Sequence, residues 1–157
     1  GEFDRVVSIG MFEAVGYKNY RVFMECVEKL LKNDGLFLLH TVGESRSMRM
    51  GNPWVTKYIF PNGMSPSLKQ VAQATEGLFI TEDVHNFGQY YDPTLIAWFN
   101  NFNNNWHVLK NRYDERFYRM WKYYILQFAG VFRARYGQLY QFVFSKNGVL
   151  GGYESIR

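Results

Sequence analysis

Three side chains of types that take part in acid–base chemistry follow short apolar segments of this sequence. Glu13 comes just after the segment Val6–Ile9, His40 stands near the end of Leu36–Val42, and Tyr91 comes later in the chain. A carboxylate, an imidazole and a phenol that converge can hold a small anion or a base by hydrogen bonds. We therefore interpret these three residues as candidate members of one site.

The elements that must position Glu13 and His40 are two strands and the helix between them. Val6–Ile9 and Leu36–Val42 are apolar, as is typical of strands buried on both faces, and Tyr17–Lys32 has apolar residues at helical spacing. This order predicts a right-handed parallel crossover unit. The carboxyl ends of parallel strands meet at one edge of a sheet, where ligands collect, so Glu13 and His40 are expected on the same rim.

The rest of the sequence predicts more strands and two aromatic helices. Residues 43–64 form a long excursion with an aromatic segment, Trp54–Phe60, which indicates a lid or substrate wall. The other predicted features are a helix end at Gly35, a helix from Ser65-Pro66 to Gly77, a strand over Leu78–His85, a helix start at Asp92-Pro93, apolar helix faces over 95–109 and 117–132, and a last strand over Tyr136–Ser145.

Composition limits the class of protein and its partners. The 157 residues suffice for one domain, and 19% of them are aromatic, which indicates an apolar pocket, a surface for apolar molecules or an aromatic core. Lys and Arg outnumber Asp and Glu by 18 to 14. This excess favours an anionic partner such as a phospholipid surface, whereas no basic run is dense enough to predict nucleic-acid binding.

Several kinds of site are not expected. Cys26 is the only cysteine and lies on the apolar face of its predicted helix, which predicts a buried thiol and a reducing compartment, the cytoplasm. His40, His85 and His107 are too dispersed to predict a metal site, and no nucleophile elbow or phosphate-binding glycine motif is present. No apolar run approaches the roughly 18 residues of a membrane span, so any membrane contact is predicted to be peripheral.

Several segments together resemble the cyclopropane-fatty-acyl-phospholipid synthases. The matching segments are Phe3–Glu13, Leu38–Thr41, Lys57–Gly63, His85–Gly88 with Tyr91, Ala129–Arg135 and Gln138–Ser145. The resemblance covers nearly the whole chain. It implies an S-adenosylmethionine-dependent enzyme that adds a methylene across a cis double bond of a membrane phospholipid acyl chain.

The resemblance also implies the fold and its boundaries. It predicts the C-terminal portion of a class I, Rossmann-like α/β methyltransferase fold, with a mostly parallel sheet and flanking helices. Residues 1–157 would form the C-terminal part of one such domain. An N-terminal domain and the strand and glycine-rich loop that grip S-adenosylmethionine would lie upstream of Gly1. The chain alone is then expected to be inactive, and to pair with the missing part or with itself.

By the same resemblance, bicarbonate serves as the catalytic base after a methyl group moves from the sulfonium to the alkene. The residues matched to the bicarbonate site are Glu13, His40, Tyr91 and the backbone amide of Val42, and those matched to the cofactor pocket are Ile9 and Gly10. The family also places a cysteine in this site. Cys26 does not match it, and the matching position would lie upstream.

The aromatic helices supply candidates for the acyl-chain wall, and other functions stay open. Leu95, Tyr124 and Phe128 lie on the apolar stripes and form either that wall or plain core. A related S-adenosylmethionine-dependent methyltransferase of a small molecule is the alternative enzyme. A non-catalytic lipid-binding module is the alternative outside enzymes.

Overall fold

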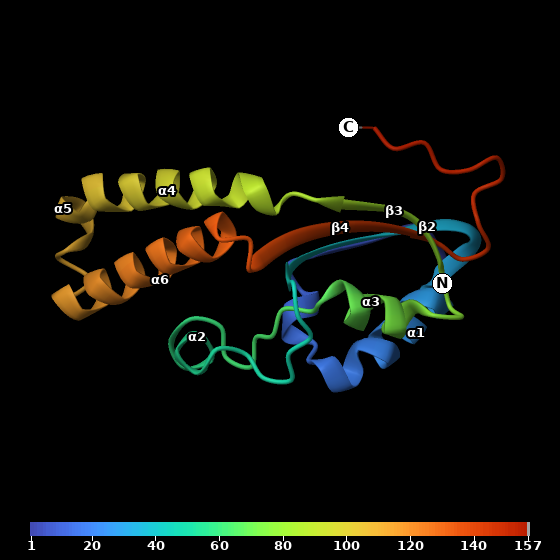
Figure 1. The fold of residues 1–157 in the computed structure, drawn as a ribbon, viewed down its shortest axis with the longest axis horizontal. Helices are drawn as coiled ribbons and strands as arrows, with labels where there is room; N and C mark the ends of the chain where they lie inside the picture. The colour runs from blue at the N-terminus through green and yellow to red at the C-terminus, as the bar shows by residue number, and fades with distance from the viewer. Residues whose placement is uncertain (157) are drawn as a thin grey trace.

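A four-stranded sheet organises residues 1–156, the part of the chain that this computed structural model describes (Figure 1). The strands are β1 (Phe3–Ile9), β2 (Leu31–Glu44), β3 (Ile80–Asn86) and β4 (Gly137–Ser145), in the spatial order β1-β2-β4-β3. The α-helices are α1 (Tyr20–Leu30), α2 (Pro53–Tyr58), α3 (Leu68–Thr75), α4 (Gly88–Asn104), α5 (Trp106–Leu109) and α6 (Glu115–Arg133). Two short 3-10 helices, η1 (Phe12–Ala14) and η2 (Tyr17–Asn19), connect β1 to α1.

The sheet is mixed, because its last strand runs against the others. β1 pairs with β2 in parallel, and β4 pairs antiparallel with both β2 and β3, so that β1, β2 and β3 share one direction. The predicted crossover unit is confirmed as β1, α1 and β2. Helix α4 leads away from the sheet and α6 returns to it, so β4 begins at the end of the sheet where β3 stops (Figure 1). This connection makes β4 antiparallel.

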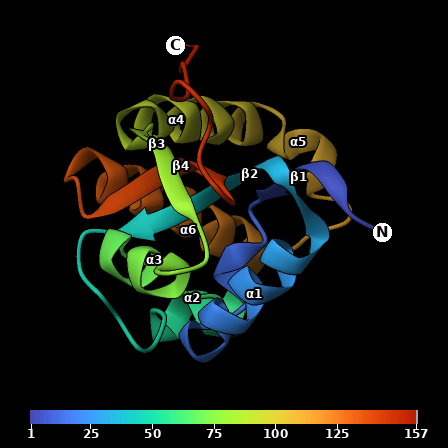
Figure 2. The same cartoon turned by 90° about the vertical axis from the view of Figure 1, so that its right-hand side faces the viewer.

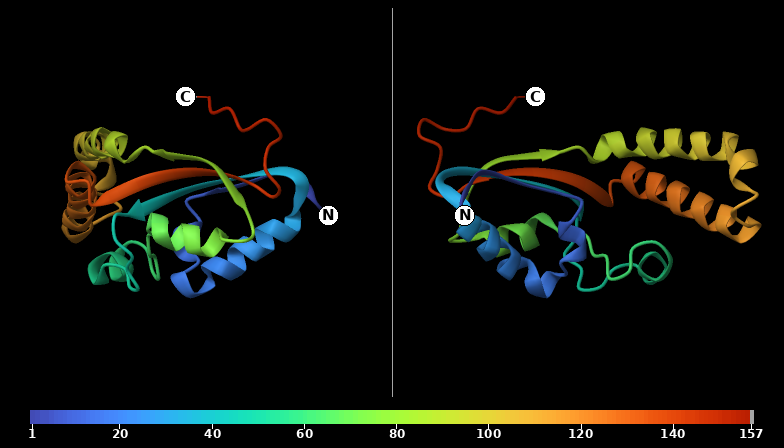
Figure 3. Two further views of the ribbon diagram at one scale, coloured as in Figure 1. Left: turned by 45° about the vertical axis from the view of Figure 1, so that its right-hand side comes forward. Right: turned by 180° about the vertical axis from the view of Figure 1, so that it is seen from behind.

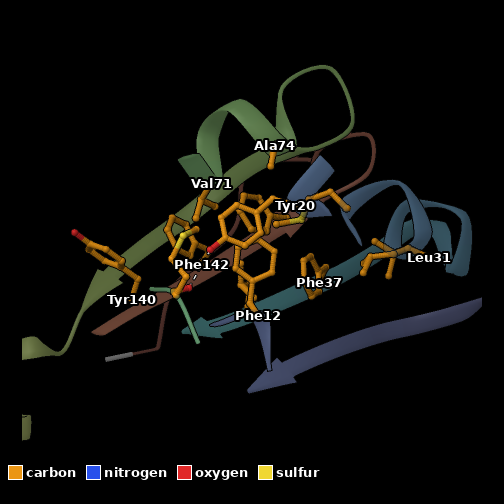
Figure 4. Close-up of a cluster of buried hydrophobic side chains, with 13 residues drawn as sticks. Phe12, Tyr20, Leu31, Phe37, Val71, Ala74, Tyr140 and Phe142 are labelled. Carbon is orange, nitrogen blue, oxygen red and sulfur yellow. Dashed lines mark hydrogen bonds between the residues drawn. The ribbon is translucent and has the colours of Figure 1, made fainter. Parts of the chain in front are cut away.

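Two apolar clusters hold these elements together. The first lies between the sheet and helices α1 and α3, which cover the same face (Figures 2 and 4). Its largest fully buried side chains include Phe12, Phe37 and Phe144. The second cluster lies between α4 and α6, which extend side by side beyond the sheet both in Figure 1 and from behind in the right-hand view of Figure 3. The aromatic residues of this chain therefore form both its core and the helical extension.

Helix α1 ends earlier than predicted. Leu31 is fully buried and begins β2, so the chain becomes extended before Gly35. Gly35 is itself a buried strand residue, and a β-carbon there would lie 2.6 Å from Cγ of Leu31. The glycine is needed for a close approach inside the strand rather than for a helix end, so the predicted helix end at Gly35 is wrong.

Two predicted helix starts are also displaced. Helix α3 begins after Ser67, whose Oγ accepts a hydrogen bond from the Gln70 N–H at 3.2 Å in a capping box, and not at Ser65-Pro66. Helix α4 begins at Gly88, so Pro93 lies inside its first turns. The predicted helix start at Asp92-Pro93 is wrong, because α4 already begins five residues before Pro93. As the sixth residue of the helix, Pro93 lies beyond the N-terminal positions that suit proline and lacks the N–H that would bond within the helix.

The buried face of α1 differs from the one that its apolar pattern predicts. Tyr20, Met24 and Val27 are buried against the sheet. Cys26 is exposed, and Val22 beside it is 56% exposed. The prediction of a buried thiol is wrong, because α1 carries two apolar stripes and the sheet covers only one of them.

Candidate functional site

The first strand ends in a glycine turn that places Glu13 at the sheet rim. Gly10 adopts a φ of 63°, which favours glycine, and its N–H donates to the backbone oxygen of His40 at 3.0 Å. Ile9 lies opposite His40 in the parallel register of β1 and β2. Glu13 follows within η1. The rim predicted from the sequence therefore brings Ile9, Gly10, Glu13 and His40 together.

Only one oxygen of the Glu13 carboxylate has a hydrogen-bond partner within residues 1–156. Its Oε1 accepts a hydrogen bond from the backbone N–H of Val42 at 2.6 Å. Its Oε2 is buried and has no hydrogen-bond partner within residues 1–156. The Glu13 backbone oxygen accepts from the Met64 N–H at 2.8 Å, which ties the turn to the loop before α3. One carboxylate oxygen is thus fixed, and the other is an acceptor without a donor.

The bond from Val42 changes the role expected for that residue. The resemblance assigns the Val42 amide to bicarbonate, but in this structure its N–H donates to Glu13. Val42 therefore orients the carboxylate. Its direct contact with bicarbonate stays a prediction that requires this hydrogen bond to be shared or exchanged.

His40 lies partly buried beside the Glu13 carboxylate. Burial lowers the pKa of His40 below its ordinary value of 6.5, and the negative charge of Glu13 acts in the opposite direction. Its ring lies 6.2 Å from that of Phe87 between centroids. The imidazole is consequently neutral at pH 7, with one nitrogen able to donate and the other able to accept.

We expect Glu13→Gln to lower the pKa of His40 further. The substitution removes the negative charge that favours the imidazolium and leaves the burial that opposes it. Titration of the imidazole by NMR measures the change, and Glu76→Gln, at an exposed position, is the control. A higher His40 pKa in Glu13→Gln would contradict the placement of these two residues.

The same lowered pKa of His40 makes folding stability pH-dependent. As the pH falls below 6.5, the unfolded chain takes up this proton before the folded chain does, so the free energy of unfolding declines. Chemical denaturation at several pH values measures the decline. We expect it to be shallower in His40→Gln, and an equal slope in both proteins would contradict this assignment.

Tyr91 and Tyr124 continue the site along the helical extension. Burial raises the pKa of Tyr91, and the charge of Glu13 raises it further. Burial also raises the pKa of Tyr124, with a smaller contribution from Tyr91. Glu13, Tyr91 and Tyr124 are therefore close enough to interact electrostatically. Both phenols keep their protons at neutral pH and are available as hydrogen-bond donors.

One site residue was not identified from the sequence. Tyr20 is 2% exposed, its ring stacks on Phe12 at 4.2 Å between centroids, and its hydroxyl donates to the Met64 backbone oxygen at 3.1 Å. Burial raises the pKa of Tyr20, and Glu13 adds to the increase. Within the predicted helix Tyr17–Lys32, nothing in the pattern of residues indicated that Tyr20 supports the Glu13 turn.

The three candidates for the acyl-chain wall differ in their exposure. Leu95 is 1% exposed inside the cluster between α4 and α6, as a core residue is. Tyr124 and Phe128 are half-buried at its margin, with ring centroids 5.1 Å apart. Tyr124 also contacts Phe60, which follows α2, in an edge-on arrangement at 5.8 Å. Only Tyr124 and Phe128 therefore present part of their surface to a ligand.

Ile9, which the resemblance matches to the cofactor pocket, is 67% exposed on β1. Within residues 1–156, no group of three or more His, Cys, Asp or Glu side chains is arranged to hold a metal ion. No helix in that part of the chain has both the length and the apolar character required to cross a bilayer.

Comparison with known proteins identifies the family. Residues 1–142 match the family model described as mycolic acid cyclopropane synthetase. The chain belongs to this family. It is also 50% identical over 156 residues to the cyclopropane-fatty-acyl-phospholipid synthase of Escherichia coli K12, and 32% identical over 156 residues to the tuberculostearic acid methyltransferase UfaA1 of Mycobacterium tuberculosis.

The alignments cover the chain and its relatives unequally. They include 99% of this chain but 41% of the E. coli synthase, and 94% of this chain but 36% of UfaA1. The chain thus spans less than half the length of these relatives. The activities named for these relatives belong to proteins that are more than twice as long as the matched segment.

Solved structures of cyclopropane synthases have the same fold. The mycolic acid cyclopropane synthase CmaA1 complexed with SAH and CTAB matches 92% of this chain, which is 56% of that protein, with a TM-score of 0.83 and 28% identity. The cyclopropane synthase MmaA2 from Mycobacterium tuberculosis matches with the same coverage and TM-score at 25% identity. These matches confirm the predicted α/β methyltransferase fold class.

Proposed function

We propose that this chain forms part of an S-adenosylmethionine-dependent synthase that builds a cyclopropane ring at a cis double bond of a phospholipid acyl chain. The observation that carries the proposal is the Glu13 carboxylate, fixed at the sheet rim by Val42 with its other oxygen buried and unpartnered. Membership of the cyclopropane synthetase family and the similarity to the cyclopropane-fatty-acyl-phospholipid synthase of E. coli support it. The single cysteine of these residues favours the cytoplasm. The excess of Lys and Arg over Asp and Glu favours peripheral contact with an anionic membrane.

The residues at the rim fit bicarbonate. Oε2 of Glu13 is a buried acceptor that lacks a donor, and the hydroxyl of a bicarbonate ion is one. The neutral imidazole of His40 and the protonated phenol of Tyr91 are donors for the other oxygens of such an ion. Bicarbonate, when bound, supplies the base that accepts the proton lost on ring closure.

The residues of the chain have distinct parts in this mechanism. Val42 holds Glu13, and Glu13 holds and orients the anion through its free oxygen. His40 and Tyr91 keep the anion in place by hydrogen bonds. Both side chains are neutral, because burial lowers the pKa of His40 and raises the pKa of Tyr91. Ile9 and Gly10 lie on the same rim, where we place the bound S-adenosylmethionine that supplies the methyl group.

The aromatic residues suit the substrate. An alkene is a poor nucleophile, so close approach and exclusion of water must contribute much of the rate. Tyr124 and Phe128 offer half-buried aromatic faces beside Tyr91, and such faces also stabilise nearby cationic charge. We propose that these two residues, with Leu95 behind them, form the wall along the acyl chain.

The activity is best tested in a chimera, because the E. coli relative is much longer than this chain. In the chimera, residues 1–157 replace the matching segment of the E. coli synthase, to which they are 50% identical. The product is measured by mass spectrometry as the gain of one methylene in an unsaturated phospholipid. A folded chimera that leaves phospholipids unchanged but methylates a small amine would favour the alternative function, a methyltransferase of a small molecule. A folded chimera that only binds lipid would favour the non-catalytic module.

We expect the 157-residue chain alone to bind S-adenosylmethionine weakly. The residues that we place at the cofactor are Ile9 and Gly10, and the glycine-rich loop expected upstream of Gly1 stays a prediction. Calorimetric titration of the purified chain measures the affinity, with the chimera as the control. Micromolar binding by the chain alone would contradict the proposed division of the cofactor site.

A further inference from the structure

An aromatic and basic surface lies beside the proposed acyl-chain wall. We call it the α2–α6 surface, and it consists of Lys57, Tyr58, Phe60, Arg116, Arg119 and Tyr123. Its three aromatic side chains are well exposed, Tyr58 at 39%, Phe60 at 49% and Tyr123 at 51%. Large aromatic side chains that are exposed together on one surface mark an interaction site more often than chance placement.

Aromatic contacts join the two elements of this surface. Trp54 of α2 lies edge-on to Tyr123 of α6 at 4.6 Å and contacts Tyr58 at 5.5 Å. Phe60 contacts Tyr124, which belongs to the proposed wall. Helix α2 lies beside α6 in the views of Figures 1 and 3. The surface is therefore continuous from the exterior to the place where the acyl chain is expected.

The charged residues of the surface are free to meet an anion. Arg116, Arg119 and Tyr123 follow one another along one side of α6 by helical spacing, and Lys57 lies over the Tyr58 ring at 5.1 Å. Among residues 1–156, neither arginine nor Lys57 forms an ion pair. Residues 88–135 contain seven Lys or Arg and three Asp or Glu, which accounts for the entire net charge of +4 of the chain.

We propose that the α2–α6 surface binds an anionic phospholipid bilayer, an inference that rests on the proposed function. Tyr58, Phe60 and Tyr123 enter the interfacial region, where amphipathic rings are favoured, and the cations contact lipid phosphates. The contact of Phe60 with Tyr124 places this surface next to the wall, so a lipid bound at the surface lies near the proposed acyl-chain site. A second copy of this chain fits less well, because identical basic surfaces repel each other.

Vesicle binding by the 157-residue chain tests this surface. Each lysine or arginine near an anionic bilayer contributes about a fivefold change in affinity, so Arg116→Gln with Arg119→Gln is expected to weaken binding about thirtyfold. The vesicles contain phosphatidylglycerol and phosphatidylcholine in equal parts, with phosphatidylcholine alone for comparison. The control is Lys29→Gln with Lys69→Gln, which removes the same charge from exposed positions on α1 and α3.

The results distinguish binding by the α2–α6 surface from a general attraction of positive charge to the anionic bilayer. An equal loss of affinity in both double variants, or no binding to phosphatidylglycerol vesicles by the unaltered chain, would overturn the proposal. Circular dichroism checks folding, and Lys57→Gln tests the other element with an expected fivefold loss. Phe60→Ser is expected to weaken binding at high salt as well, where the charged contribution is screened.

Turnover in the chimera distinguishes failure of this inference from failure of the proposed function. If the surface docks on bilayers, the arginine double variant loses turnover on vesicles but retains it on lipid dispersed in detergent. Equal loss on both substrates would overturn the docking role. A chimera without turnover on either substrate would refute the proposed function, while the vesicle affinities would still decide whether this surface binds lipid.

Discussion

Glu13→Gln in the chimera is expected to lower cyclopropane formation about a hundredfold to ten-thousandfold, the range typical of losing acid–base assistance. The substituted amide keeps an oxygen that accepts from the Val42 N–H, so the turn after β1 is retained. It replaces the free acceptor Oε2 with an NH₂ donor, which cannot accept a hydrogen bond from an anion's hydroxyl. Turnover is measured under saturating S-adenosylmethionine.

Two further measurements show whether this loss is specific. The affinity for S-adenosylmethionine and the melting temperature are expected to change little, because Gly10 and the hydrogen bond from Val42 remain. Glu76→Gln, on the exposed end of α3, is expected to leave turnover intact. An unchanged rate in Glu13→Gln would remove Glu13 from the mechanism, and a large loss of stability would reduce it to a structural residue.

The sequence predicted the strands and the rim more accurately than the helix ends. Strands β2 and β4 are apolar segments whose burial follows from residue type. The prediction that Val6–Ile9 is buried on both faces is wrong, because β1 is an edge strand and Val7 and Ile9 are 60% and 67% exposed. Glu13 and His40 come together because parallel strands end at one edge. The predictions at Gly35 and Asp92-Pro93 are wrong because the residue types that end or start helices also occur in a crowded strand and inside a helix. Local signals do not reveal which of these contexts applies.

The details of the site depend on contacts that no local pattern encodes. The hydrogen bond from Val42 to Glu13 joins residues 29 positions apart, and it gives the Val42 amide a role in orienting the carboxylate besides the predicted contact with the anion. Tyr20 interacts with Glu13 only because α1 folds back over the turn. The exposure of Cys26 likewise depends on which of two apolar stripes of α1 the sheet covers.

Leu95→Ala and Phe128→Ala are expected to differ in how much stability and how much turnover each loses, although both residues belong to the cluster between α4 and α6. Leu95 is 1% exposed, so its truncation leaves a cavity and costs about 2 to 5 kcal/mol of the free energy of unfolding. Phe128 is half-buried at the margin of the cluster, where water fills part of the space left by truncation. We therefore expect a smaller loss of stability and a larger loss of turnover for Phe128→Ala.

Denaturation of each variant of the chain and turnover of the folded chimera test this pair. Phe128→Leu is the control for the aromatic ring, because it keeps apolar bulk but loses the face that stabilises cationic charge. If Phe128 lines the acyl chain, Phe128→Leu recovers stability more fully than it recovers turnover. A large loss of stability in Phe128→Ala with normal turnover per folded molecule would make Phe128 a core residue like Leu95, and would leave Tyr124 as the half-buried aromatic residue of the proposed wall.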